Sequence, residues 1–192
     1  KFHDIVLSLK GSDIFDTIGS YRRISKLCDY PLHLGTTATG GPGQGIVKSS
    51  IAIGSLLLDG IGDTIRVSLT DCPEEEVRAA RNILQSLYLR NFGPEIISCP
   101  TCGRCEINLV SLVRDFEQAL SKEGFVSCRK PVKVALMGCV VNGPGEAKES
   151  DIGIAFGRKD GLIFKKGRPA GKVKINEAKA RLLKELRSLT KS

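Results

Sequence analysis

The first half of the chain alternates short apolar runs with segments of helical periodicity. The runs at residues 2–9, 31–35 and 63–69 predict strands. Between and after them, helices are expected through Cys28, over about 47–59 and over 73–87. Asp13 or Ser12 can cap the first helix, and three glutamates occupy the first turn of the third, where the helix dipole favours acids. Strands that alternate with helices at this spacing predict parallel βα units.

Three βα units cannot close a barrel, so residues 1–93 are expected to be the C-terminal part of a (β/α)8 barrel of the TIM type. The chain also begins at Lys1 without a methionine, which suggests a fragment or a processed product. In such barrels, chemistry lies at the carboxyl ends of the strands. Here those ends hold Lys10, the loop 36–45, and Arg66 with Ser68. Two cations and a hydroxyl indicate an anion site, with phosphate as the expected ligand; ordinary solubilising residues at strand ends remain the alternative.

The pattern changes after Gly93-Pro94, where a domain boundary is expected. The second half predicts strands at 95–98, 132–137 and 151–156, and a hairpin of 162–164 with 170–175. It also predicts helices at 106–123 and 176–189, and a glycine-rich loop at 139–146. We therefore expect residues 94–192 to form a small α+β domain.

The composition is that of a soluble globular protein, with 41% apolar residues among 192. The longest apolar run, residues 51–58, is interrupted by Gly54 and Ser55 and is far shorter than the ~20 residues that span a bilayer. No secretory signal pattern precedes it. These features predict a cytoplasmic protein that does not enter a membrane.

The net charge of +8 lies entirely in the second half. Residues 1–93 hold ten basic and ten acidic residues, whereas residues 94–192 hold nineteen and eleven. A basic half can face nucleic acid, an anionic substrate or an acidic protein, or it can be a solvated surface. With three tyrosines, seven phenylalanines and no tryptophan, the chain has few platforms on which bases could stack, which disfavours nucleic acid.

Seven cysteines form an odd set without the regular spacing of a disulfide framework, and in a reducing compartment they favour metal binding or catalysis. Cys28, Cys72 and Cys128 stand alone and are interpreted as small hydrophobic residues. The informative thiols are in two stretches, Cys99-Pro-Thr-Cys102 and Met137-Gly-Cys-Val-Val-Asn-Gly-Pro-Gly-Glu146.

Three interpretations compete for these thiols. Structural zinc favours a second C-x-x-C or a histidine pair, and a thioredoxin-like turn belongs at a helix N-terminus in a βαβ unit; the sequence supports neither well. What remains is a site of three thiolates with a harder ligand or an open position as the fourth. Glu146 is the candidate for that place, and Cys105 is its competitor unless its thiol faces the core of the following helix.

These motifs resemble the 4-hydroxy-3-methylbut-2-enyl diphosphate synthase family of the methylerythritol phosphate pathway. The matching segments are 98–104, 134–147, 30–35 and 60–69. The matches correspond to the C-terminal part of the family's length. The fold implied is the last βα units of a TIM-type barrel followed by a small α+β iron-sulfur domain of the sulfite/nitrite-reductase-like kind.

The resemblance implies a [4Fe-4S] cluster on Cys99, Cys102 and Cys139, with Glu146 on the fourth iron and acting in catalysis. The activity implied is that of an oxidoreductase: a two-electron reductive opening of 2-C-methyl-D-erythritol 2,4-cyclodiphosphate, with loss of water, to the linear allylic diphosphate. Lys10, Arg66 and Ser68 fall on positions that contact the substrate diphosphate. The electron donor implied is flavodoxin or ferredoxin, whose acidity suits the basic half.

The resemblance also implies a homodimer in which the cluster domain of one subunit covers the barrel of the other, in the cytoplasm or a plastid stroma. Two departures qualify it. Ala38 stands where the family has a glutamate that acts in proton transfer, and the earlier barrel strands are absent. A cluster-bearing paralogue or fragment without turnover, or a basic zinc or nucleic-acid-binding module, therefore remain as alternatives.

Overall fold

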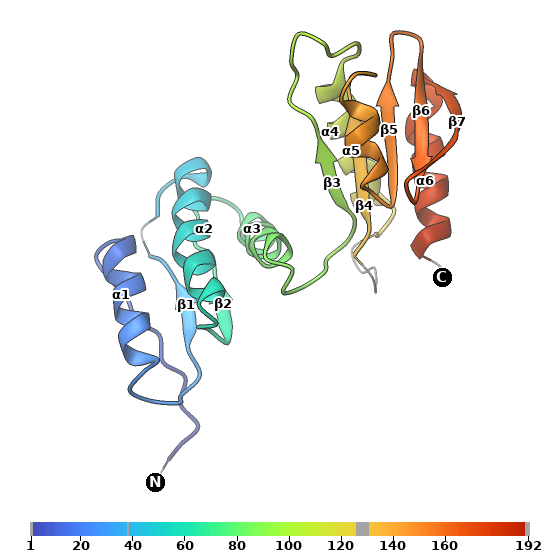
Figure 1. Cartoon of the computed structure of the whole chain (residues 1–192). Coiled ribbons are helices and arrows are strands. Elements are labelled where there is room, and N and C mark those ends of the chain that lie inside the picture. The colour runs from blue at the N-terminus through green and yellow to red at the C-terminus, as the bar shows by residue number, and fades with distance from the viewer. Residues whose placement is uncertain (1, 38, 126–130, 191–192) are drawn as a thin grey trace. The chain divides into compact units, whose positions relative to one another are not determined.

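The computed structural model describes residues 2–37, 39–125 and 131–190. Ala38 and Cys128 lie outside these ranges. The chain divides into two compact units, residues 1–90 and 91–192, three residues before the boundary expected from the sequence (Figure 1). Each unit is described by itself.

The first unit alternates helices with short parallel strands. Its described elements, in chain order, are α1 (Ile14–Ile24), β1 (His33–Gly35), α2 (Pro42–Leu58), β2 (Thr64–Arg66) and α3 (Pro73–Ser86). β1 and β2 pair in parallel with Gly35 opposite Arg66. The parallel βα order predicted for this half is therefore present, and its apolar residues pack between helices and strands.

The predicted first strand, residues 2–9, is wrong. Only one parallel bridge forms, between Leu7 and Leu32. The ladder stops because the buried Tyr21 takes the next backbone groups: its hydroxyl accepts a hydrogen bond from Leu9 N (2.9 Å) and donates to the carbonyl oxygens of Leu9 and His33. One α1 side chain thus ties the N-terminal segment to β1 in place of strand pairing.

Helix boundaries in the first unit follow their capping residues. Asp13 caps α1, as predicted, by accepting from Asp16 N, but α1 ends at Ile24 and not at Cys28. α2 begins at Pro42, five residues before the predicted start, since proline suits the first helical turn. Four large apolar side chains of α2 are exposed in this structure: Ile46, Val47, Ile51 and Leu58.

The second unit is a five-stranded mixed sheet with three helices. Its described elements, in chain order, are β3 (Glu95–Ser98), α4 (Leu109–Lys122), β4 (Lys133–Met137), α5 (Gly143–Lys148), β5 (Ile152–Phe156), β6 (Asp160–Lys165), β7 (Arg168–Lys174) and α6 (Ile175–Thr190). The strands follow their sequence order across the sheet. β3, β4 and β5 are parallel, and β6 and β7 are antiparallel additions.

The two faces of this sheet carry different helices, as Figure 1 shows. Alternate residues of β4 and β5, such as Leu136 and Ile154, pack with Phe116 of α4 and Leu182 of α6 in the larger core. On the opposite face, Met137 and its neighbours pack against α5 in a smaller core of mostly small residues. The sheet is thus covered on both sides at the strands that lead to the cysteine loops.

The predicted loop 139–146 is wrong in its second half, because α5 begins at Gly143. This helix approaches the sheet closely. A Cβ on Gly143 would lie 2.8 Å from Met137 Cβ, and one on Gly153 of β5 would lie 2.6 Å from the Ala147 carbonyl oxygen. Glycine at both positions lets α5 pack directly on the strands, which fixes the segment after Cys139.

The other boundaries in the second unit are close to the predicted ones. β3 has the predicted bounds, α4 starts at Leu109 with Asn108 as its cap, and the hairpin and final helix are present. Along the described ranges, no helix combines the length and apolar character needed to cross a membrane.

Candidate metal centre

Cys99 and Cys139 lie at the same edge of the sheet. β3 and β4 are parallel neighbours with Ser98 opposite Leu136, so the loops that carry these cysteines leave adjacent carboxyl ends. The two loops meet at Gly138, whose N–H donates to Cys99 Sγ at 3.2 Å. Cys99 therefore contacts the residue directly before Cys139.

The thiol of Cys139 lies among backbone donors. The N–H groups of Asn142, Gly143 and Val141 hydrogen-bond to it and lower its pKa, and Arg104 adds a smaller effect in the same direction against the cost of burial. Cys139 itself is buried. Because metals bind the thiolate form, these donors favour the state that a ligand must adopt.

Cys102 lies in a tight turn of the loop that follows β3 and also carries Cys99. Cys102 N donates to Pro100 O, and Cys105 N donates to Cys102 O at 2.9 Å, which closes the turn. The Cys102 side chain is exposed. After the turn, Glu106 N donates to Gly138 O at 2.8 Å, so the turn and the Cys139 loop are joined by backbone contacts.

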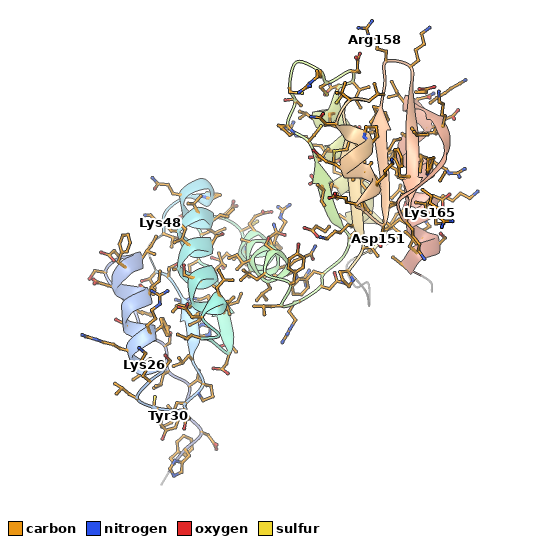
Figure 2. All side chains as sticks on the ribbon, in the orientation of Figure 1. Lys26, Tyr30, Lys48, Asp151, Arg158 and Lys165 are labelled. Carbon is orange, nitrogen blue, oxygen red and sulfur yellow. The ribbon has the colours of Figure 1, made fainter. Side chains whose placement is uncertain are left out.

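An ion pair joins the end of this turn to the segment between β5 and β6. Arg158 lies at the turn between β5 and β6, as Figure 2 shows, and its Nε is 2.8 Å from Glu106 Oε2. Both groups are partly solvated, so the pair contributes roughly 0–1 kcal/mol.

Cys105 packs against Gly138 rather than facing solvent. Its sulfur donates to Ile107 O at 3.3 Å, and a Cβ on Gly138 would lie only 2.4 Å from it. The thiol is half-buried and belongs to the partly buried shell around the larger core. This placement agrees with the interpretation of Cys105 as a thiol that faces the following helix.

Glu146 lies in the first turn of α5, and its side chain is exposed. The packed face of α5 is formed by Gly143 and Ala147, so the glutamate is next to that face and not part of it. Its carboxylate can change orientation without unpacking the helix.

The donor set is of a chemical type that an iron-sulfur cluster uses, because Cys99, Cys102 and Cys139 offer thiolates. Within the described ranges, no three His, Cys, Asp or Glu side chains are grouped to hold one metal ion. Cluster thiolates also accept backbone N–H groups, as the sulfurs of Cys99 and Cys139 do here.

The first unit holds a half-buried arginine, Arg66, at the end of β2. Arg66 lies over Gly35: a Cβ on Gly35 would lie 3.3 Å from the Arg66 terminal nitrogen Nη2 and 3.4 Å from its Nε. Among the described side chains, Arg66 Nε is buried without a hydrogen-bond partner. A buried guanidinium nitrogen without a partner is costly, so an anion at this position would satisfy it.

The other two predicted anion ligands are Lys10 and Ser68. Lys10 follows the Leu7 to Leu32 bridge by three residues, where no strand pairing continues, and Ser68 follows β2 by two residues. Lys10 is exposed. The backbone of Ser68 is fixed, because its carbonyl accepts from Thr39 Oγ1.

Two family models match the chain, one to each unit. The GcpE TIM-barrel domain matches residues 1–81, and the GcpE protein C-terminal domain matches residues 95–188. The chain belongs to the GcpE family. The first match gives the first unit as part of a TIM-barrel domain, in agreement with its parallel βα order.

Curated GcpE relatives carry the name 4-hydroxy-3-methylbut-2-en-1-yl diphosphate synthase (flavodoxin). The protein of Lawsonia intracellularis is 57% identical over 168 residues, which cover 88% of this chain and 45% of the relative. Those of Clostridium tetani and Thermodesulfovibrio yellowstonii are 53% and 54% identical, over 98% and 97% of the chain and 52% of each relative. The chain spans about half the length of the curated relatives it matches.

Sequence reasoning misses three parts of the site. Nothing in the spacing of the motifs points to Arg104, although it lies near enough to Cys139 to favour the thiolate. The backbone environment of Cys139 is missed because the glycine-rich pattern indicates a loop, whereas α5 begins at Gly143. Pro144 is the sequence signal that could have indicated this helix, since proline is favoured in the first helical turn. The packing of Arg66 on Gly35 depends on strand register, which local sequence does not specify.

Proposed function

We propose that this chain is the C-terminal part of a 4-hydroxy-3-methylbut-2-enyl diphosphate synthase. The reaction would be the two-electron reductive ring opening and dehydration of 2-C-methyl-D-erythritol 2,4-cyclodiphosphate in isoprenoid biosynthesis. The observation that carries the proposal is the meeting of the Cys99 and Cys139 loops at Gly138, whose backbone N–H donates to the Cys99 sulfur. The names of the relatives support it.

Cys99, Cys102 and Cys139 would hold a [4Fe-4S] cluster, with Glu146 as its oxygen ligand. When bound, such a cluster supplies single electrons and an iron position that exchanges ligands. The backbone donors to Cys99 and Cys139 favour their thiolates and orient them. The exposed carboxylate of Glu146 is free to move toward or away from the site, as an exchangeable ligand must be.

The strand ends of the first unit would bind the diphosphate. The half-buried Arg66 supplies an Nε–H group that has no other described partner, and Lys10 would add an exposed positive charge. Ser68 would add a hydroxyl from the segment after β2. Together these groups would neutralise and position the anionic half of the substrate.

An acidic electron carrier is proposed as the protein partner. The relatives' names specify flavodoxin, and residues 94–192 hold the whole positive excess of the chain. We further propose a homodimer that completes the site and a location in the cytoplasm, or in the stroma if the organism has plastids. Ferredoxin is the alternative donor.

Ala38 bears on the turnover rate. It follows β1 in the sequence at a position expected to carry a glutamate, and it lies outside the described residues. If the missing carboxylate limits proton transfer, Ala38→Glu should raise the rate. An unchanged rate would remove the reason to consider a cluster-bearing paralogue without turnover.

The test is a single-turnover assay on the anaerobically reconstituted full-length protein, which joins this chain to the earlier barrel strands. Reduced flavodoxin and the cyclodiphosphate are mixed with it, and the linear diphosphate is measured by mass spectrometry. We expect product from the unsubstituted protein and none from Cys139→Ser, with Cys28→Ser as the thiol control. A protein that carries its cluster, accepts electrons and forms no product would refute the proposed reaction.

A further inference from the structure

The thiol pair Cys102 and Cys105 is a second feature of the cysteine turn, and the proposed cluster uses only one of its members. The sequence Cys102-Gly-Arg-Cys105 is a C-x-x-C motif that overlaps the first one. Cys105 N donates to Cys102 O at 2.9 Å, which is the hydrogen bond of a four-residue turn. Such turns bring the first and last Cα atoms within about 7 Å. A disulfide spans about 4.4–6.8 Å between Cα atoms, so the turn suits one.

We propose that Cys102 and Cys105 form a reversible disulfide when the cluster is absent. The consequence for cluster assembly rests on the proposed function, because Cys102 is there a cluster ligand and Cys105 is not. The disulfide would withdraw Cys102 from the ligand set and hold it in a form that a thiol reductant restores. Cys105 would thus shield Cys102 from irreversible oxidation.

The exposures of the two thiols give the order of events. Cys102 is exposed and meets a small disulfide in solution first, whereas Cys105 is half-buried against Gly138. Cys102 attacks one sulfur of oxidised glutathione and displaces one glutathione thiol. Cys105 then attacks the Cys102 sulfur of the mixed disulfide and displaces the second. Two S–H bonds are lost and one S–S bond forms, with two electrons and two protons passing to the two glutathione molecules.

Other pairings are less favourable in this structure. Cys99 is half-buried, and its sulfur accepts the Gly138 N–H. Cys139 is buried among the backbone donors of the α5 start. To react, Cys99 would have to give up this hydrogen bond, and Cys139 would have to leave its buried position. Cys105 gives up only the contact of its thiol with Ile107 O.

The test uses the metal-free chain in anaerobic buffers of defined reduced and oxidised glutathione. Free thiols are alkylated, and the protein is analysed by intact mass and peptide mapping. We expect a species lacking two hydrogens and two alkyl groups, with the bond mapped to Cys102 and Cys105. Cys105→Ser is the matched variant, because a serine hydroxyl can still donate to Ile107 O. It should form no such species and should instead keep a glutathione adduct on Cys102.

The second measurement is iron and sulfide uptake by the reduced and the oxidised chain. Oxidised chain should take up little iron until a thiol reductant is added, while Cys105→Ser that was never oxidised should load like the unsubstituted chain. Full alkylation of every cysteine at high oxidised glutathione, or a bond mapped to another pair, overturns the inference. If the disulfide forms but reduced chain binds no iron, the proposed cluster fails and the disulfide stands. If iron binds and no disulfide forms, only the inference fails.

Discussion

Replacing Gly138 by alanine tests the geometry of the cysteine site most sharply. The new Cβ would lie 2.4 Å from Cys105 Sγ and 3.3 Å from Leu109 Cδ2. Ordinary contact begins at 3.4 Å, so the sulfur must move by about 1 Å into an already packed core edge. Overpacking of this kind costs about 1–3 kcal/mol of unfolding free energy. Gly138 lies outside the left-handed region of backbone angles, so the cost is steric and not a matter of backbone strain.

The assay is urea unfolding of the reduced, metal-free chain followed by circular dichroism. Gly138→Ala should lower the unfolding free energy by about 1–3 kcal/mol. Gly145→Ala is the matched control, since its Cβ meets nothing within 4 Å. In the double variant with Cys105→Ala, the nearest remaining atoms are at 3.3 and 3.5 Å, so most of the loss should be recovered. Strictly additive losses in the double variant would refute the contact between Cys105 and Gly138.

Three further predictions concern other named contacts. Tyr21→Phe should lower the unfolding free energy by about 1 kcal/mol, because it removes the hydroxyl partner of part-buried backbone groups of Leu9 and His33; an unchanged urea midpoint would contradict this. Inorganic pyrophosphate should raise the melting temperature, and Arg66→Met should lose that rise while Lys26→Met keeps it; an equal rise in both argues against the anion site. Lys165 Nζ lies 2.7 Å from Glu185 Oε2 and lowers the pKa of that carboxyl in the folded state. The stability that this pair adds is therefore present above the ordinary pKa of 4.5 and is lost as the pH falls through the lower pKa of the folded state. The stability difference between the unsubstituted chain and Glu185→Gln should therefore shrink in acid, as followed by melting temperature; a constant difference would count against the pair.

Local signals predict most of the secondary structure. The Asp13 cap, the acidic first turn of α3 and the bounds of β3 are confirmed, because each depends on neighbours in the sequence. The predicted first strand is wrong because a distant hydroxyl, that of Tyr21, takes the backbone groups a strand partner would have used. No local pattern specifies such a contact.

In the candidate site, too, some features follow from local sequence and others depend on the tertiary fold. Spacing and residue type alone single out Cys99, Cys102 and Cys139, since metal ligands have a narrow chemistry. The backbone donors to Cys139 follow from a short helix whose start depends on packing of Gly143 against the sheet. The placement of Cys105 against Gly138 likewise needs the tertiary fold. The identity of the candidate ligands is therefore accessible from sequence, whereas their environment is not.

The central claim is that three cysteines hold one iron-sulfur cluster, and metal analysis after anaerobic reconstitution tests it most directly. Iron, acid-labile sulfide and zinc are measured for the unsubstituted chain and for serine variants of Cys99, Cys102 and Cys139, with Cys28→Ser as control. We predict iron and sulfide in the proportions of a [4Fe-4S] cluster in the unsubstituted chain and the control, and loss of both in each ligand variant. Stoichiometric zinc without sulfide, or iron content unchanged by Cys139→Ser, would contradict the account.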